Sequence, residues 1–131
     1  MNKAAVLLLI IVFSVAVSSC SPEISPQEAK VLVALGEIQR GVEANIAYDQ
    51  FVQRSQTARA EIDLLKQGEK ANPCFQSAVE RSYSAYEIAR KAWKKKMQEK
   101  DDNRKADLDM TLSFSLSFAS INIKRANSCY E

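Results

Sequence analysis

Residues that interrupt helices are scarce in this chain. Its 131 residues include only three prolines and three glycines, whereas alanine, glutamate, lysine, arginine and glutamine, which favour helix, are abundant. Beyond residue 25, apolar side chains recur every three or four positions through most of the sequence, as an amphipathic helix requires. The sequence therefore predicts an all-α protein built from a few long helices.

The first predicted helix covers residues 26–68. Ser25, Pro26 and Glu28 form a typical helix start, with a capping serine, a first-turn proline and a first-turn acid. Two apolar stripes follow, Val31, Leu35, Ile38 and Val42 and then Ala44, Tyr48, Phe51, Ser55, Ala58, Ile62 and Leu65. At 3.6 residues per turn the stripes differ in phase by more than about 120°. We therefore expect a kink, or a change of packing partner, near residues 41–48.

The second predicted helix covers residues 73–100, with Asn72 as its cap and Pro73 in its first turn. Its small residues form a stripe that predicts close approach of another helix: Ala78, Ser82, Ala85, Ala89 and Ala92. We expect its aromatic residues Tyr83, Tyr86 and Trp93 to belong to the core rather than to a ligand platform.

The third predicted helix covers residues 102–130. Residues 110–118 alternate between apolar and polar side chains, which is a strand pattern, but the whole segment fits helical spacing better. Two apolar stripes flank a polar one: Leu108, Leu112, Leu116, Ala119, Ile123, Ala126 and Tyr130 on one side, and Met110, Phe114, Phe118 and Ile121 on the other. Two apolar stripes predict a helix packed against two neighbours.

The start of the chain has the features of an export signal. An apolar run from Ala4 to Val17 follows Lys3 and is shorter than the roughly 20 residues that span a membrane. Residues Val17, Ser18, Ser19 and Cys20 resemble the lipobox of bacterial lipoproteins. The resemblance implies removal of residues 1–19, a palmitate-type lipid on Cys20 and a tether over residues 20–25. An ordinary cleaved signal and an uncleaved anchor remain the alternatives.

Ser21 bears on where such a lipoprotein would be attached. Serine at this position resembles the class sorted to the outer membrane, whereas aspartate marks retention in the inner membrane. The resemblance therefore implies a protein of the bacterial cell envelope, held on the outer membrane and facing the periplasm.

With Cys20 assigned to lipid, Cys74 and Cys129 remain, and an exported chain most simply pairs them; two free thiols are the alternative. The bridge would close a loop of about 55 residues and contribute roughly 4 kcal/mol in the chain-entropy model. In an up-down-up bundle the start of helix two lies beside the end of helix three. The predicted fold is therefore an up-down-up three-helix bundle in a single domain, residues 26–131, with a Cys74–Cys129 disulfide and a long first helix that either kinks or changes its packing partner near residues 41–48.

Little catalytic chemistry is available to this sequence. The chain contains no histidine, which removes the commonest general base and metal ligand. We expect no enzyme activity, cofactor or metal. A hydrolase could in principle use the acidic cluster Asp101, Asp102, Asp107 and Asp109, but helix capping explains these residues more simply.

A basic cluster spans residues 90–105. Only three acids lie within this stretch. Its eight cations are Arg90, Lys91, Lys94, Lys95, Lys96, Lys100, Arg104 and Lys105. It is either a solvated helix end or a surface for an acidic partner or anionic lipid headgroups. If residues 26–41 run straight, they hold it about 24 Å from the anchored end. The formal net charge of the whole chain is only +2, which does not indicate nucleic-acid binding.

These observations favour a small lipid-anchored envelope protein, attached to the membrane through Cys20, that acts as a non-catalytic interaction module for a protein partner. The first alternative is a structural lipoprotein that oligomerises through its long first helix.

Overall fold

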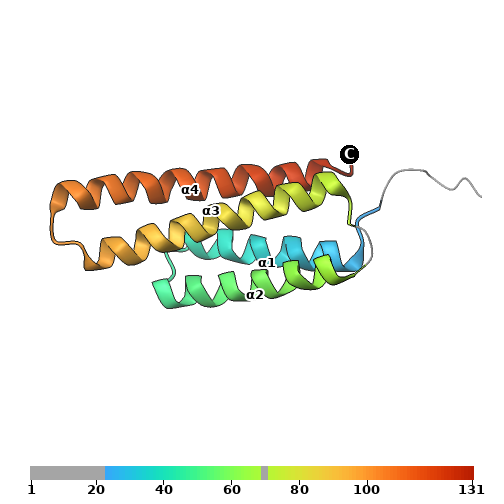
Figure 1. Ribbon diagram of the computed structural model, residues 1–131, viewed down its shortest axis with the longest axis horizontal. Coiled ribbons are helices and arrows are strands. Elements are labelled where there is room, and N and C mark those ends of the chain that lie inside the picture. The colour runs from blue at the N-terminus through green and yellow to red at the C-terminus, as the bar shows by residue number, and fades with distance from the viewer. Residues whose placement is uncertain (1–22, 69–70) are drawn as a thin grey trace, which may run out of the picture.

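The computed structural model describes residues 23–68 and 71–131, which form four α-helices and no strand. The helices are α1 (Pro26–Glu43), α2 (Tyr48–Gln67), α3 (Pro73–Gln98) and α4 (Asp102–Ser128). Consecutive helices run in opposite directions, so the arrangement is up-down-up-down (Figure 1). The all-α prediction is confirmed, and residues 110–118 lie within α4 rather than in a strand.

The predicted long first helix, and with it the three-helix bundle, is wrong. The chain reverses at residues 44–47, where Asn45 adopts a left-handed backbone conformation with φ of 54°. The backbone N–H of Ile46 then donates to the carbonyl of Gly41 at 3.0 Å. The two apolar stripes differ in phase because they belong to two antiparallel helices, each of which presents its own apolar face to the core.

Local signals fix the starts of α1, α3 and α4 as predicted. The hydroxyl of Ser25 accepts from the N–H of Glu28 at 3.2 Å, while the Glu28 carboxylate accepts from the N–H of Ser25 at 3.0 Å. The Asn72 side chain caps α3, and the Asp101 side chain caps α4. Each cap satisfies N–H groups that the first helical turn leaves without a partner.

The core lies between the two helix pairs and is built around aromatic side chains. Phe51 and Tyr86 are almost fully buried, and their ring centroids lie 6.1 Å apart. The half-buried Trp93 packs on Phe51 at 5.4 Å. The half-buried Tyr83 receives the guanidinium of Arg59 over its ring. The aromatic residues of α3 therefore belong to the packing, as the sequence indicates.

Helices α3 and α4 pack closely because small residues line their contact. Ala78, Ser82, Ala85 and Ala89 are buried on α3, and Ser115, Ala119 and Ala126 are buried on α4. The Ser82 hydroxyl donates to the carbonyl of Ala119 at 3.0 Å. The close approach predicted from the small-residue stripe of α3 is thus found, with α4 as the neighbour.

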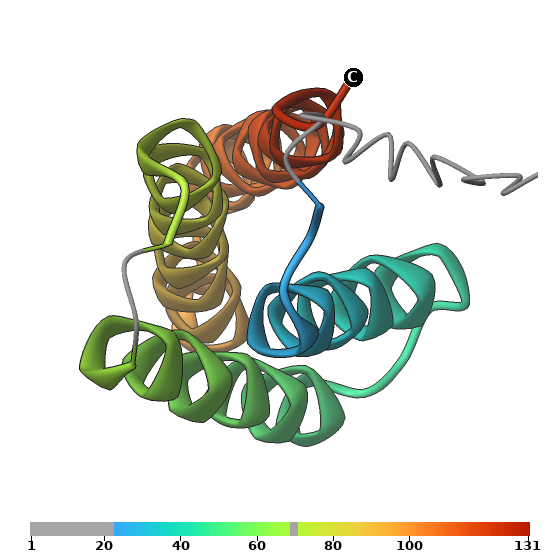
Figure 2. The ribbon, with the colours of Figure 1, turned by 90° about the vertical axis from the view of Figure 1, so that its right-hand side faces the viewer.

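The two ends of the bundle differ in character. The start of α1, the end of α2, the start of α3 and the C-terminus share one end (Figures 1 and 2), which we call the disulfide end because Cys74 and Cys129 are joined there with their Cα atoms 5.9 Å apart. The predicted pairing is confirmed. The α3–α4 connection lies at the opposite end, the basic end, which carries the cluster of residues 90–105. Helices α3 and α4 extend beyond the α1–α2 connection toward this end (Figure 1).

Candidate interaction surface

One apolar stripe of α4 is exposed. Met110 and Phe114 are 70% and 73% exposed, while Ile121 and Phe118 are 51% and 40% exposed. The other stripe, which contains Ile123 and Ala126, packs into the core. The expectation that both stripes pack against neighbouring helices is therefore wrong. With four helices in the bundle, α3 and the core cover only one flank of α4.

The exposed stripe borders a hollow of about 480 Å³ between α3 and α4. Its walls are Ile88, Met110, Phe114 and Phe118, and its floor is formed by Ala85 and Ser115. Small floor residues bring the two helix backbones together, so the bulky side chains on either side stand above the floor. We call this the apolar hollow. Sequence reasoning missed Ile88, which is 53% exposed although its neighbours along the exposed face of α3 are polar.

The basic cluster is partly neutralised by neighbouring acids. Arg90 pairs with Glu87 at 2.9 Å, Lys96 pairs with Asp109, and Lys105 pairs with Asp102 at 3.1 Å. The Arg90 guanidinium holds the pKa of Glu87 below its ordinary value. Within the described ranges, the other five cations form no ion pair: Lys91, Lys94, Lys95, Lys100 and Arg104.

Two of these unpaired cations continue the face of α3 that carries Ile88. Lys91 and Lys95 follow Ile88 by three and seven residues. On α4, the acid Asp107 precedes Met110 by three residues and Phe114 by seven. Arg104 lies about 9 Å along the helix axis before Met110, the first α4 residue that lines the hollow. The helix faces that extend from the hollow toward the basic end therefore carry two unpaired lysines and one acid.

The basic end lies far from the start of the bundle. Helix α1 runs without a break from Pro26 to Glu43, which corresponds to about 27 Å at 1.5 Å per residue. It carries the chain from the disulfide end toward the basic end, and α3 and α4 extend beyond its last turn (Figure 1). A tether attached before residue 26 thus leaves the bundle at the end opposite to the basic cluster.

The acidic cluster does not form a compact site. Asp101 caps α4, whereas Asp102 and Asp109 each pair with a lysine; Asp107 is exposed. In the part of the chain that the structure describes, no group of three histidine, cysteine or acidic residues is arranged to hold a metal ion.

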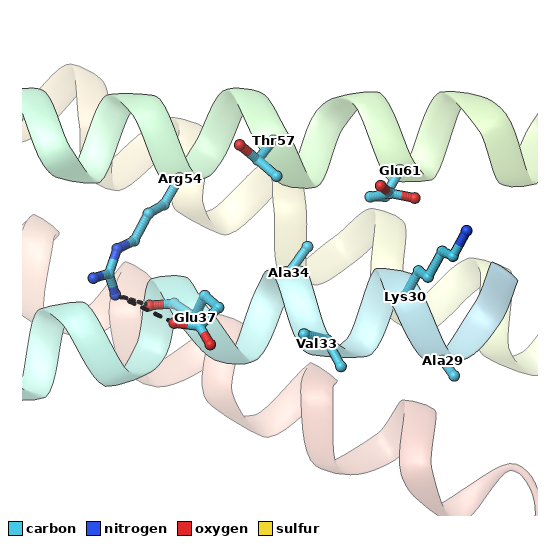
Figure 3. A pocket seen from close by; sticks show the side chains of 8 residues that line it. All are labelled: Ala29, Lys30, Val33, Ala34, Glu37, Arg54, Thr57 and Glu61. Carbon is cyan, nitrogen blue, oxygen red and sulfur yellow. Dashed lines mark hydrogen bonds and ion pairs between the residues drawn. The ribbon is translucent and has the colours of Figure 1, made fainter. Parts of the chain in front are cut away.

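Another hollow, of about 640 Å³, lies between α1 and α2. Figure 3 shows Arg54 reaching across it to Glu37, and its guanidinium donates to the Glu37 carbonyl at 2.6 Å. At its other end, the Gln27 amide donates to the Glu61 carboxylate at 2.8 Å. Because these polar groups form hydrogen bonds with one another across α1 and α2, we interpret this hollow as part of the contact between the two helices.

The lipobox segment and Cys20 lie outside the described residues, so the structure does not bear on their roles. Among residues 23–68 and 71–131, none of the helices combines the length and the apolar character that crossing a membrane requires.

Comparison of the chain with protein-family models, curated proteins and solved structures finds no match. The function is therefore argued from the residues and their arrangement.

Proposed function

We propose that this chain is a lipid-anchored protein of the bacterial envelope that binds a partner protein and performs no catalysis. Cys20 carries the lipid, and the apolar hollow receives an amphipathic helix of the partner. The observation that carries this proposal is the exposed apolar stripe of α4, in which Met110 and Phe114 are 70% and 73% exposed. Grouped apolar side chains on a surface mark interaction sites.

Charge indicates the character of the bound helix. Lys91 and Lys95 continue the face of α3 that carries Ile88 and form no ion pair among the described residues, whereas α4 carries the acid Asp107 on its corresponding face. A helix that buries an apolar stripe in the hollow would place its flanks against these cations. The partner segment is therefore an amphipathic helix with acidic flanks, bound in the helix-in-groove mode.

Binding to designed peptides tests this specificity. One peptide carries leucines at helical spacing with glutamates on both flanks, and the matched peptide carries lysines instead. A form of the protein beginning at Ser21 contains every described helix and the disulfide. We expect it to bind the glutamate peptide and to ignore the lysine peptide, with binding that weakens as salt rises.

Two variants sharpen this test. Phe114→Ser removes the most exposed wall of the hollow and should weaken binding of the glutamate peptide by roughly 30-fold, as loss of an aromatic anchor does. Leu64→Ser is the matched control, because Leu64 is a 52% exposed apolar residue on α2. The proposal is wrong if neither peptide binds, if both bind equally, or if the two variants lose affinity alike.

The anchor is tested separately in cells. Cys20→Ala should abolish labelling by a fatty-acid analogue and leave an unprocessed precursor, because lipoprotein processing requires this cysteine. The wild-type protein should fractionate with the outer membrane, as Ser21 implies. Equal labelling of the variant would refute lipid attachment at Cys20.

A structural role through self-association is the second candidate. The long first helix expected to carry it is two antiparallel helices, α1 and α2, so the exposed stripe of α4 is the surface that favours it. Light-scattering mass of the Ser21 form distinguishes the candidates. A stable oligomer that Phe114→Ser dissociates would favour self-association over partner binding.

A further inference from the structure

A second hollow between α3 and α4, of about 380 Å³, lies at the disulfide end. Arg81 and Ser77 line it from α3, and Arg125 and Ser128 line it from α4, beside the Cys74–Cys129 bridge. We call it the arginine hollow. It is separate from the apolar hollow, with which it shares no lining residue.

Both arginines lack an acidic partner. Neither Arg81 nor Arg125 forms an ion pair within residues 23–68 and 71–131, and no carboxylate lines the hollow. The nearest acid of α3, Glu80, is engaged by Lys66 at 3.0 Å. Two guanidinium groups from opposite walls, with serine hydroxyls beside them, form a surface that suits a phosphate group.

The floor of the hollow is closed by a buried asparagine. Asn122 lines the hollow and is fully buried. Its Nδ2 donates to the carbonyl of Phe118 at 2.9 Å, and its Oδ1 has almost no accessible surface. A ligand in the hollow would therefore contact the two arginines and the serines above this floor.

We propose that the arginine hollow binds a phosphate ester, with a phospholipid headgroup of the glycerol phosphate type as its source. The two arginines, one on each wall, neutralise the phosphate.

The position of the hollow fits a membrane source, and this step rests on the proposed anchor at Cys20. Arg125 lies three residues before the end of α4 and Arg81 eight residues after the start of α3, which correspond to about 5 and 12 Å along the bundle. The tether of residues 20–25 spans at most about 20 Å. A lipid on Cys20 would therefore keep the arginine hollow near the membrane surface and the basic cluster away from it.

Titrations of the Ser21 form with small phosphates test the site without the anchor. The probes are glycerol phosphate, ethyl phosphate and inorganic phosphate, and the readout is the NMR signals of the Arg81 and Arg125 side chains. Both esters should move both signals. If neither ester moves either signal, the proposal is wrong. Tighter binding of inorganic phosphate than of either ester would make free phosphate the ligand.

Charge-matched variants then locate the binding on vesicles. Phosphatidylcholine vesicles containing phosphatidylglycerol should bind the Ser21 form, and Arg81→Gln/Arg125→Gln should weaken this binding about tenfold. The control Lys94→Gln/Lys100→Gln removes two unpaired cations at the basic end and should change little. Both pairs are exposed, so circular dichroism should report unchanged folding.

Three other outcomes would overturn the proposal or limit it. Loss of vesicle binding in the control pair alone would assign lipid contact to the basic cluster and overturn the proposal. Displacement of glycerol phosphate by the glutamate peptide would instead make the hollow part of the protein-binding surface. Binding by the Ser21 form together with failed labelling at Cys20 would keep the phosphate site and reject its membrane setting.

Discussion

Gly36 and Gly41 lie in the same helix, yet the structure gives them different roles. A Cβ at Gly41 would lie 2.5 Å from the Cδ1 of Ile46 and 2.8 Å from a guanidinium nitrogen of Arg54. The missing side chain therefore leaves room for the side chains of Ile46 and Arg54. A Cβ at Gly36 would meet nothing within 4 Å, so Gly36 has no such role.

This difference predicts opposite effects of alanine at the two positions. Gly36→Ala should stabilise the protein by about 0.5–1 kcal/mol, since it restores helix propensity without a clash. Gly41→Ala should destabilise it by about 1–2 kcal/mol, because Ile46 and Arg54 must move. Urea unfolding of the two variants checks this. If both changes stabilise the protein, the turn does not depend on Gly41.

The charge state of Glu28 depends on contacts with Ser25, at the start of α1, and with Tyr130, near the C-terminus. Glu28 is buried, its carboxylate caps α1 through Ser25, and it accepts a hydrogen bond from the Tyr130 hydroxyl. Burial raises the pKa of Glu28, but these hydrogen bonds outweigh it and hold the pKa below the ordinary value of 4.5. The charged form therefore favours the folded state.

The lowered pKa predicts loss of stability in acid. The stabilisation by Glu28 is complete above pH 4.5, the ordinary pKa, and is lost as the pH falls through the lower pKa of the folded state. Tyr130→Phe should move the pKa of Glu28 upward and reduce the acid-dependent part of the unfolding free energy. Carboxyl NMR titration and urea unfolding at several pH values measure both effects. An unchanged Glu28 titration in the variant would contradict the coupling.

At the scale of elements, the apolar residues of α4 form two groups, one buried in the core and one exposed on the surface. Ile123 and Ala119 pack into the bundle, whereas Met110 and Phe114 face outward. The division arises because α3 approaches α4 closely along small residues, and α1 lies against only part of its remaining surface.

This division predicts that substitutions at a buried and at an exposed apolar residue of α4 lower the unfolding free energy by different amounts. Ile123→Ala should lower the unfolding free energy by about 2–4 kcal/mol, because it leaves a cavity in the core. Phe114→Ser should change it by no more than about 0.5 kcal/mol, as exposed substitutions do. Urea unfolding of both variants provides the comparison. A large loss at Phe114 would mean that this side chain supports the fold rather than a partner.

At the scale of the whole molecule, the disulfide joins the start of α3 to the end of α4 across 55 residues of sequence. It therefore holds the second helix pair together at the end where the tether enters. The Glu28–Tyr130 contact brings the start of α1 to the same end.

Removal of the bridge should destabilise the whole bundle. Cys74→Ser/Cys129→Ser should lower the unfolding free energy by up to about 4 kcal/mol, the chain-entropy value for a loop of this length. Thiol titration of the denatured Ser21 form should find no free thiol, because that form lacks Cys20. Two titratable thiols would show that the bridge does not form in the isolated protein.

The sequence by itself determined the helix starts and the helical segments, because these depend mainly on residues close together in the chain. The caps at Ser25, Asn72 and Asp101, and the helical character of residues 102–128, follow from local hydrogen bonding and periodicity. The pairing of Cys74 and Cys129 was predicted because they are the two cysteines that remain once Cys20 is assigned to lipid, and their places at the start and the end of antiparallel helices agreed with it.

Only the tertiary structure decided which apolar helix faces are buried against a neighbour and which are exposed. The phase change near residues 42–48 fits either a bent helix or two helices, and the choice depends on whether α1 can pack against α2. Likewise, the stripe of Met110 and Phe114 looks equally suited to a core or a surface. Its exposure follows from the number and placement of neighbouring helices, which spacing along one helix does not encode.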